Sequence, residues 1–348
     1  MKITYLSDAI YPYNKGGKEK RLFEITTRLA TRGHDVHIYT MKWWKGLSVI
    51  TENGVTLHAI SPLYKLYNPE GKRSIKQALA FSFFVFTALL KEDFDVVDID
   101  HMPYFPIFPA YLIAKIKGKK AIITWHEYWG SYWFTYLGLK GVFGYTTEVI
   151  SSVFGRKIAV SKLTQKRLGK NTKYIPNGID FEEIRKAKQI KSFDILFVGR
   201  LIKEKNVDFL IDSVKDKFSL GIIGVGPEQE RLKKLAKVYP KIKFLGNVKE
   251  TKKVYGYMKG AKIFAFPSER EGFGIVVLEA IACGTPAIVL NGRDNASRFL
   301  VDKKYVCTKG DFARELEKIV KNHFRVSLST KEYDWNKITD QAVGVYQE

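Results

Sequence analysis

The sequence predicts an α/β protein of two domains, each built on a parallel sheet. A chain of 348 residues exceeds what one hydrophobic core usually organises, so two domains are expected. Apolar residues make up 45% of the chain and aromatic residues 14%, which is enough for two cores. Short apolar runs alternate with helical patterns, as they do in βαβ units. Because these runs form two series, we expect two Rossmann-like domains.

The first series of apolar runs fills the N-terminal half of the chain. Helical patterns over 21–31 and 74–90 lie between the runs. The apolar run 78–90 is shorter than the roughly 20 residues that cross a bilayer, so it predicts a buried helix. The chain opens on a strand pattern, and we expect no signal peptide. The expected strands are 3–6, 35–39, 55–60, 96–99, 121–124 and 157–160.

The second series follows a polar stretch near 171–180, where a Pro-Asn-Gly turn indicates a domain boundary. We expect one domain over 1–173, a second over 174–334, and a final helix over 335–347. Ligands of open α/β sheets bind at the carboxyl ends of the strands, so two facing domains would enclose a site in the cleft between them. The expected strands are 194–198, 219–223, 241–245, 261–266 and 286–290.

The charge of the chain predicts an anionic partner. The formal net charge is +22, from 58 basic and 36 acidic residues. The candidates are nucleic acid, an anionic membrane surface, and a small anionic substrate such as a nucleotide sugar or a lipid phosphate. No nucleic-acid motif is present and the basic residues are scattered, so we expect no nucleic-acid partner. A solvated basic coat from a thermophilic source would explain the same composition.

The two cysteines, Cys283 and Cys307, have no metal-ligand spacing. A reduced, cytoplasmic setting without disulfides is the expected environment.

The segment around Glu271 carries the strongest functional signal. An apolar strand pattern ends at Pro267, and a helix is expected to begin near Gly274. Glycines allow a ligand to approach the backbone, and the amides of a helix start favour phosphate or sugar oxygens. Glu271 in the loop and Glu279 on the helix could each accept hydrogen bonds from the hydroxyls of a sugar or ribose. The alternative is a solvated loop glutamate and a glutamate on the helix surface.

This segment resembles the Glu-x7-Glu signature of retaining glycosyltransferases with the GT-B fold, glycosyltransferase family 4. The resemblance spans nearly the whole chain because further motifs recur in the expected order. They are Gly16-Gly17, Thr124-Trp125-His126-Glu127, Ala159-Val160-Ser161, Ile175-Pro176-Asn177-Gly178-Ile179-Asp180, Val198-Gly199-Arg200 with Lys205, and Gly224-Val225-Gly226-Pro227.

The resemblance implies two Rossmann-like domains, a nucleotide-diphosphate sugar as donor, and neither metal nor other cofactor. It implies that Glu271 holds hydroxyls of the transferred sugar and that Glu279 holds the ribose. It also implies that the final helix joins the N-terminal domain, adding 335–348 to it. The backbone amides implied to bind sugar and phosphate oxygens are those of Phe273, Gly274, Ile275 and Val276.

Basic residues and glycines at other strand ends suit the donor's diphosphate. Arg200 offers a planar fork and Lys205 a movable charge, and together they could stabilise a departing diphosphate, although surface basics are common in this chain. By resemblance, Gly16 and Gly17 present backbone amides to the diphosphate, and Gly226 belongs to the donor site. A third glycine of a dinucleotide fingerprint is missing because Gln229 stands there, which argues against NAD.

His126 closes a predicted strand and by resemblance lies beside the transferred sugar, where it positions the sugar or stabilises charge at the anomeric centre. A structural histidine is the alternative. Asp98-Ile99-Asp100 resembles the metal-binding Asp-x-Asp of the other major glycosyltransferase fold. We interpret it instead as the end of a parallel strand, since the remaining motifs belong to the metal-independent class.

Aromatic residues suggest contact with an acceptor or a membrane. Trp125, Trp129 and Trp133 recur every fourth residue, which predicts an aromatic helix face that is either core or a cradle for an acceptor. The run 42–45, Lys-Trp-Trp-Lys, is typical of membrane interfaces. With the net charge, these features motivate a hypothesis of peripheral attachment to the inner face of the cell membrane and a lipid-linked acceptor.

The function expected from the sequence is therefore a metal-independent, retaining glycosyltransferase of the hexosyltransferase type, acting on a glycan or lipid-linked acceptor. Because no nucleophilic carboxylate is placed, a front-face mechanism is favoured over double displacement. Two alternatives remain, a nucleotide-sugar epimerase on the same fold and a non-catalytic polyanion-binding protein. The donor base, the sugar and the acceptor are not identified by these motifs.

Overall fold

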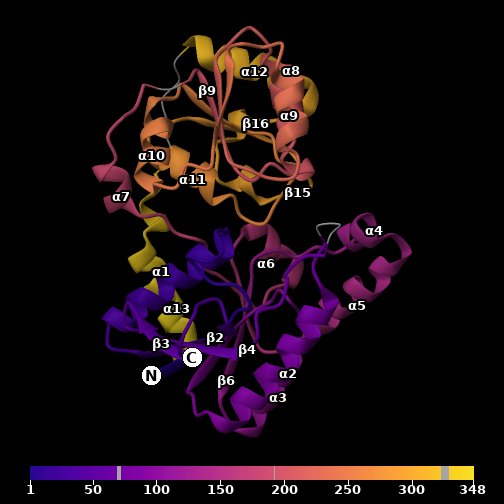
Figure 1. Ribbon diagram of the computed structural model, residues 1–348, viewed down its shortest axis with the longest axis vertical. Coiled ribbons are helices and arrows are strands. Elements are labelled where there is room, and N and C mark those ends of the chain that lie inside the picture. The colour runs from indigo at the N-terminus through magenta and orange to yellow at the C-terminus, as the bar shows by residue number, and fades with distance from the viewer. Residues whose placement is uncertain (69–71, 192, 323–328) are drawn as a thin grey trace. The chain divides into compact units, whose positions relative to one another are not determined.

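The computed structural model describes the chain except for residues 69–71, 192 and 323–328. The described residues form two compact units (Figure 1). Unit 1 comprises Met1–Asn177 and Trp335–Glu348, and unit 2 comprises Gly178–Asp334. Among the described residues, no helix combines the length and apolar character needed to span a bilayer.

The sheet of unit 1 has the strand order β3-β4-β2-β1-β5-β6-β7-β8. All neighbouring strands in it are parallel except β3 and β4. Since β2 lies on one side of β1 and β5 on the other, the strand order reverses between β1 and β5. The strands are β1 Lys2–Leu6, β2 Asp35–Met41, β3 Val49–Glu52, β4 Val55–Ser61, β5 Val96–Asp100, β6 Lys120–Trp125, β7 Arg156–Ala159 and β8 Thr172–Tyr174.

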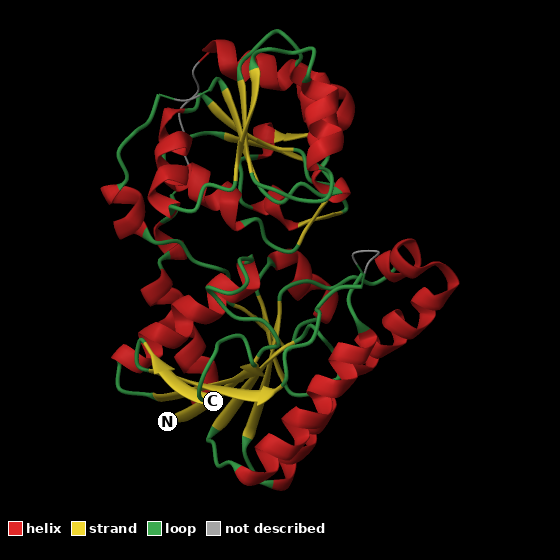
Figure 2. Ribbon diagram, viewed as in Figure 1, coloured by secondary structure: helices red, strands yellow, loops and turns green. Residues whose placement is uncertain are grey.

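Helices cover both faces of this sheet (Figure 2). One apolar cluster joins β1 and β2 to helices α1 and α13, and another joins β5 and β6 to α2 and α3. The side chains of β1 alternate between the clusters, with Ile3 and Tyr5 in the first and Leu6 in the second, as a strand buried on both faces requires. The helices are α1 Gly17–Thr31, α2 Ile75–Lys91, α3 Ile107–Ile116, α4 Tyr132–Leu137, α5 Gly141–Ser151, α6 Lys162–Leu168 and α13 Trp335–Gln347.

The C-terminal helix α13 completes the core of unit 1. Trp335 and Ile338 are fully buried in the cluster that contains Ile3. Near the end of the helix, the Tyr346 hydroxyl donates to Asp98 Oδ2 at 2.6 Å and lies 2.8 Å from the Tyr5 hydroxyl. The expectation that this helix joins the N-terminal domain is confirmed.

Unit 2 has a parallel sheet with the strand order β11-β10-β9-β12-β14-β16, which reverses between β9 and β12. A short parallel pair, β13 and β15, lies apart from it. The strands are β9 Ile195–Val198, β10 Leu220–Ile223, β11 Ile242–Gly246, β12 Ile263–Phe266, β13 Arg270–Glu271, β14 Ala287–Leu290, β15 Asp294–Asn295 and β16 Val306–Cys307. The helices are α7 Phe181–Lys186, α8 Val207–Val214, α9 Gln229–Ala236, α10 Thr251–Gly260, α11 Ile275–Ala282 and α12 Lys309–Asn322.

Every strand expected from the sequence is present within two residues of its expected ends. Five further strands were not among those expected, namely β3 and β8 of unit 1 and the short strands β13, β15 and β16 of unit 2. The turn between β3 and β4 contains Asn53 and Gly54, both with positive φ (52° and 77°), which is the conformation of a tight hairpin turn. An Asn-Gly pair is the usual sequence signal for such a hairpin, so β3 could have been predicted.

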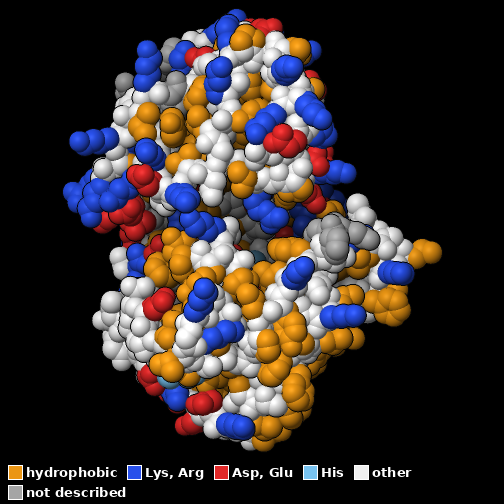
Figure 3. All heavy atoms as spheres, viewed as in Figure 1, with side chains coloured by type: hydrophobic (Ala, Val, Ile, Leu, Met, Phe, Trp, Pro, Cys, Tyr) orange, Lys and Arg blue, Asp and Glu red, His pale blue; other side chains and the backbone are white. Residues whose placement is uncertain are grey.

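Helix α2 differs from the fully buried helix that the sequence predicted. It begins after Ser74, whose hydroxyl accepts a hydrogen bond from the Gln77 amide and so caps the first turn. Phe81, Val85 and Leu89 are buried, but the opposite face of the helix is exposed (Figure 3). The prediction failed because Phe83 and Phe86 fill solvent-facing positions, which a count of apolar residues does not detect.

Candidate functional site

The expected donor residues of unit 2 lie where its sheet reverses strand order. The chain leaves the carboxyl ends of β9 and β12 at this reversal. The carboxyl edge of the sheet at such a reversal is the usual ligand position in an open α/β sheet. The loop after β9 carries Arg200 and Lys205, and the loop after β12 carries Glu271. The loops are joined, since Asn206 Nδ2 donates to the Pro267 carbonyl at 3.1 Å.

Lys205 and Glu271 form an ion pair through Lys205 Nζ and Glu271 Oε2. Their side chains are only 15% and 19% exposed. The Lys205 ammonium also lies 4.8 Å from the ring centre of Phe266, the last residue of β12. Arg200 lies two residues after the last residue of β9 and is exposed. The structure thus places a cation and a carboxylate predicted from separate motifs in direct contact.

The backbone around Glu271 is held by a neighbouring loop. Glu271 lies on β13, which pairs with β15 in parallel register. In β15, the Asn295 side chain is fully buried and donates to the Ser268 and Leu290 carbonyls at 2.8 and 2.9 Å. This amide fixes the loop to the end of β14, and no motif in the sequence indicated it.

Helix α11 begins beside Glu271 at a position that requires glycine. Gly274, its N-cap, has a φ of 94°, which favours glycine. A Cβ added there would lie 2.7 Å from Ser297 Cβ. The N-cap residue has no side chain, so it makes no side-chain hydrogen bond to the first amides of the helix. Phe273 and Ile275 are buried and Val276 is partly exposed, so any contact of these residues with a ligand would come mainly from the backbone.

Glu279 is 6% exposed and therefore does not lie on the helix surface. It accepts a hydrogen bond from the Tyr255 hydroxyl at 3.0 Å. Burial and the neighbouring Glu279 carboxylate raise the pKa of Tyr255 above its ordinary value, so this hydroxyl keeps its proton and remains a donor. The alternative of a solvated Glu279 is wrong.

The Gly224 and Gly226 loop packs tightly against the loop after β9. A Cβ on Gly224 would lie 1.9 Å from the Gly199 carbonyl oxygen, and one on Gly226 would lie 2.3 Å from the Leu201 carbonyl oxygen. These glycines therefore allow close backbone packing beside Arg200. Helix α9 begins at Gln229, so Pro227 lies in the preceding turn and not at the first helical position.

In unit 1, charged side chains gather where its own sheet reverses order, between β1 and β5. Lys18, in the first turn of α1, lies 3.1 Å from Asp8 Oδ1 and 3.2 Å from Asp100 Oδ2. Arg73 forms a second ion pair with Asp8, whose side chain is fully buried. Gly16 is the extended N-cap of α1 and Gly17 is its first residue. Any ligand of the Gly16 and Gly17 amides would therefore lie close to Lys18.

His126 follows β6 and joins this cluster. Its Nε2 lies 2.8 Å from Asp100 Oδ1. Burial opposes ionisation of Asp100, but the Lys18 ammonium and the hydrogen bond from His126 outweigh it and hold the pKa of Asp100 below its ordinary value. Burial likewise opposes the charge on Lys18, while Asp100 and Asp8 raise its pKa above the usual range. Because the Asp100 carboxylate can only accept, His126 Nε2 must carry the shared hydrogen.

Asp98 lies in the interior of unit 1, where other side chains of the protein occupy its hydrogen-bonding groups. Burial raises its pKa to about 6, although hydrogen bonds from Tyr346 and Thr124 favour the charged form. In the described part of the chain, no group of three or more His, Cys, Asp or Glu side chains is arranged to hold a metal ion.

Two family models match the chain, one in each half. The model of Glycosyltransferase Family 4 matches residues 15–183, and that of Glycosyl transferases group 1 matches residues 180–335. The chain belongs to glycosyltransferase family 4. It is a glycosyltransferase.

Curated relatives of this glycosyltransferase act on lipids, by their names. It is 27% identical to a phosphatidyl-myo-inositol mannosyltransferase of Mycobacterium leprae over 288 residues, covering 74% of this chain and 75% of the relative. It is also 27% identical to the gpi3 subunit of phosphatidylinositol N-acetylglucosaminyltransferase of Schizosaccharomyces pombe, covering 80% of this chain and 63% of that protein.

Solved structures show that the fold is GT-B. The sucrose-phosphate synthase of Thermosynechococcus elongatus matches with a TM-score of 0.81 and 16% identity, covering 99% of this chain and 98% of that chain. The Anabaena protein Alr3699/HepE, solved in complex with UDP, matches with a TM-score of 0.74 and 17% identity, covering both chains fully.

The aromatic repeat of the glycosyltransferase does not form one helical face, contrary to the sequence prediction. Trp125 ends β6, Trp129 lies in the following turn, and Trp133 lies in the short helix α4. The three side chains are nevertheless buried, and the ring centres of Trp129 and Trp133 lie 4.5 Å apart. The three side chains are part of the core. Their spacing of four residues suggested a helix, but the segment begins at the end of a strand and only its last tryptophan lies in a helix.

Glu148 is a buried residue of the glycosyltransferase that sequence reasoning missed. From α5, its carboxylate accepts hydrogen bonds from the amides of Trp129 and Gly130 and from the Tyr104 hydroxyl, each at 2.7 Å. It thereby fixes the turn that follows His126. No motif marks it, since its partners are 18 or more residues away.

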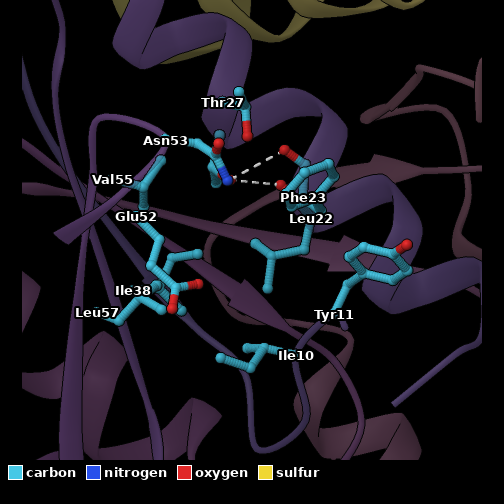
Figure 4. Close-up of a pocket in the computed structure, with 11 residues that line it drawn as sticks. Ile10, Tyr11, Leu22, Phe23, Thr27, Ile38, Glu52, Asn53, Val55 and Leu57 are labelled. Atoms are coloured by element: carbon cyan, nitrogen blue, oxygen red, sulfur yellow. Dashed lines mark hydrogen bonds between the residues drawn. The ribbon is translucent and has the colours of Figure 1, made fainter. Parts of the chain in front are cut away.

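A cavity of about 30 Å³ lies between α1 and the β2–β4 edge of unit 1 (Figure 4). Ile38, Val55 and Leu57 line it together with Leu22 and Phe23. It has room for no more than a water molecule or two, and none of the expected site residues lines it. We therefore do not assign it to the glycosyl transfer site.

Proposed function

We propose that the protein transfers a sugar from a nucleotide-diphosphate sugar to a lipid-linked or glycan acceptor, with retention of anomeric configuration and without a metal ion. The observation that carries the proposal is the Lys205–Glu271 ion pair beside the helix start at Gly274. It combines a cation, a carboxylate and a glycine-lined helix start, which are the groups needed for a phosphate attached to a polyhydroxyl ligand. The UDP complex of the Anabaena neighbour supports a nucleotide donor.

In this proposal, the residues of unit 2 hold the donor. Arg200 and Lys205 contact the diphosphate, and the amides from Phe273 to Val276 bind sugar and phosphate oxygens. Glu279, fixed by the Tyr255 hydroxyl, accepts hydrogen bonds from the ribose. When the donor enters, its phosphates take over Lys205, and Glu271 is released to accept hydrogen bonds from the hydroxyls of the transferred sugar.

The proposed contribution of unit 1 centres on His126. The hydrogen bond to Asp100 fixes the orientation of its ring, and we assign the ring to positioning the transferred sugar and stabilising charge at its anomeric carbon. No carboxylate is assigned as a nucleophile. The departing phosphate would instead help to deprotonate the acceptor on the same face, while Arg200, Lys205 and the helix start neutralise the leaving group.

The acceptor is proposed from the relatives, whose names specify phosphatidylinositol substrates. A lipid-linked acceptor is consistent with a cytoplasmic protein that works at the inner face of the cell membrane. A soluble glycan remains the other acceptor class.

A thermal-shift screen against nucleotides and nucleotide sugars tests the donor proposal. A ligand present at a hundred times its dissociation constant stabilises the protein by about 2.7 kcal/mol, a shift that such a screen resolves. Glu271→Gln should bind nucleoside diphosphates normally but turn over at least about a hundredfold more slowly. Its matched control is Glu269→Gln, an exposed glutamate two residues earlier that pairs with Lys309.

Several outcomes would contradict the proposal. No stabilisation by any nucleotide would remove the donor site, and consumption of the donor without an acceptor would favour an epimerase. Loss of activity on adding a chelator, restored by a divalent metal, would refute metal independence.

A further inference from the structure

Helix α2 exposes a continuous apolar stripe. Its buried face packs Phe81, Val85 and Leu89 against the sheet. On the other face, exposed apolar residues recur at spacings of three and four, so they lie in one row along the helix. The row consists of Ile75, Leu79, Phe83, Phe86 and Leu90, with exposed fractions between 38% and 63%.

The hairpin of α4 and α5 exposes a second set of apolar side chains. Leu139, in the connection between the two helices, is 92% exposed, and Phe143 and Val153 are more than 70% exposed. Large contiguous apolar patches are rare on the surfaces of soluble monomers and usually mark a binding surface, so the exposure of these side chains calls for an explanation. Phe134, Val142 and Ile150 add further exposed apolar surface.

The two sets belong to one surface of unit 1. The Tyr136 hydroxyl of α4 accepts a hydrogen bond from the Arg73 amide, just before α2 begins. At the other end of α5, the ring of Phe154 contacts Phe108 and Tyr111 of α3, which itself packs on α2. Figure 3 shows orange side chains gathered over the edge where α2, α3 and α5 run in Figure 1.

The charges on this surface have one sign. Within the described helices Ile75–Lys91, Ile107–Ile116, Tyr132–Leu137 and Gly141–Ser151, Glu148 is the only acidic residue, and it is fully buried. Acidic residues resume at Glu92, beyond the last turn of α2. Exposed lysines lie on the helices and in the α4–α5 connection, namely Lys76, Lys91, Lys115 and Lys140.

We propose that this surface docks onto an anionic lipid bilayer. The stripe of α2 and the α4–α5 hairpin would lie in the boundary between headgroups and acyl chains, with the lysines among the lipid phosphates. An apolar face bordered by cations, with no exposed acid inside its four helices, complements an anionic bilayer in both respects. A second copy of the chain would bring the lysines of the two copies together, which like charges oppose.

This inference concerns where the protein binds and is independent of the proposed transfer reaction. It is tested without donor or acceptor, by sedimenting the full chain with vesicles of phosphatidylcholine alone or with an equal share of phosphatidylglycerol. We expect binding to the anionic vesicles that weakens with salt. Phe83→Gln and Phe143→Gln should each weaken it at least about tenfold, since each removes a side chain that inserts into lipid.

The control is Val238→Gln, which changes an apolar residue of unit 2 that is 71% exposed and should not alter binding. Lys76→Gln should weaken binding about fivefold, and only to anionic vesicles. Because these residues are exposed, the variants should melt with the wild type. Failure of the wild type to bind anionic vesicles at low salt, or equal loss in the Val238 control, would overturn the proposal. So would a tight dimer in sedimentation equilibrium that Phe83→Gln dissociates.

Discussion

At the scale of single residues, the proposed donor role of Lys205 implies that substrate binding rearranges the Lys205–Glu271 pair. Each side chain neutralises the other, and both are mostly screened from solvent. A phosphate that approaches Lys205 competes with Glu271 for the same ammonium. The sequence indicated both residues through separate motifs, but their contact depends on the loops after β9 and β12 and could not be predicted from spacing.

Lys205→Ala tests the role of the cation. We expect turnover to fall by about a hundredfold or more, because a charge that stabilises the leaving diphosphate is lost. Activity is measured under saturating donor. Lys203→Ala is the matched control, since Lys203 is an exposed lysine on the same short turn. Equal effects of the two substitutions would mean that Lys205 contributes only to the general basic field.

At the scale of elements, glycines determine how the loops and helices of unit 2 meet. Gly274 and Gly284 lie at opposite ends of α11 and have similar positive φ values, 94° and 85°. A side chain at Gly284 would meet open space, whereas one at Gly274 would meet Ser297. The two positions therefore separate backbone strain from crowding.

We expect Gly284→Ala to lower the free energy of unfolding by about 1 kcal/mol through strain alone. Gly274→Ala should cost more, because Ser297 or the helix start must move, and it should also weaken nucleotide binding. Chemical denaturation and nucleotide titration of both variants measure these effects. Unchanged nucleotide binding by Gly274→Ala would remove this helix start from the donor site.

The elements that sequence patterns predicted well are the buried strands, because runs such as Ile195–Val198 are apolar on both faces. Patterns failed where tertiary contacts decide the structure. The Trp125, Trp129 and Trp133 spacing imitates a helix but spans a strand end. The acceptor role of Glu148 depends on backbone amides far away along the chain.

At the scale of the whole molecule, Asp98 joins the centre of the first sheet to the end of the last helix. It accepts hydrogen bonds from Tyr346 of α13 and from Thr124 of β6. Burial raises its pKa to about 6, whereas an aspartate in an unfolded chain titrates near pH 4. Between about pH 4 and 6 the folded state therefore binds more protons than the unfolded state, and this carboxyl destabilises the fold as pH rises.

Asp98→Asn should remove this dependence. We expect the stability of the wild type, relative to the variant, to decrease by about 3 kcal/mol as pH rises across that window. Urea denaturation at several pH values measures it, with Asp212→Asn, an exposed aspartate of α8, as the control. A constant difference between wild type and Asp98→Asn would show that Asp98 is already ionised throughout.

Unit 1 is assembled from two separate stretches of the chain, while unit 2 is one continuous stretch between them. A ribosome therefore delivers all of Gly178–Asp334 before it delivers Trp335 and Tyr346, which fill the core of unit 1. The later half of the gene encodes the part that can finish folding first. Until α13 has been synthesised, the apolar face of the nascent sheet at β1 and β2 is covered by α1 but lacks the side chains of α13.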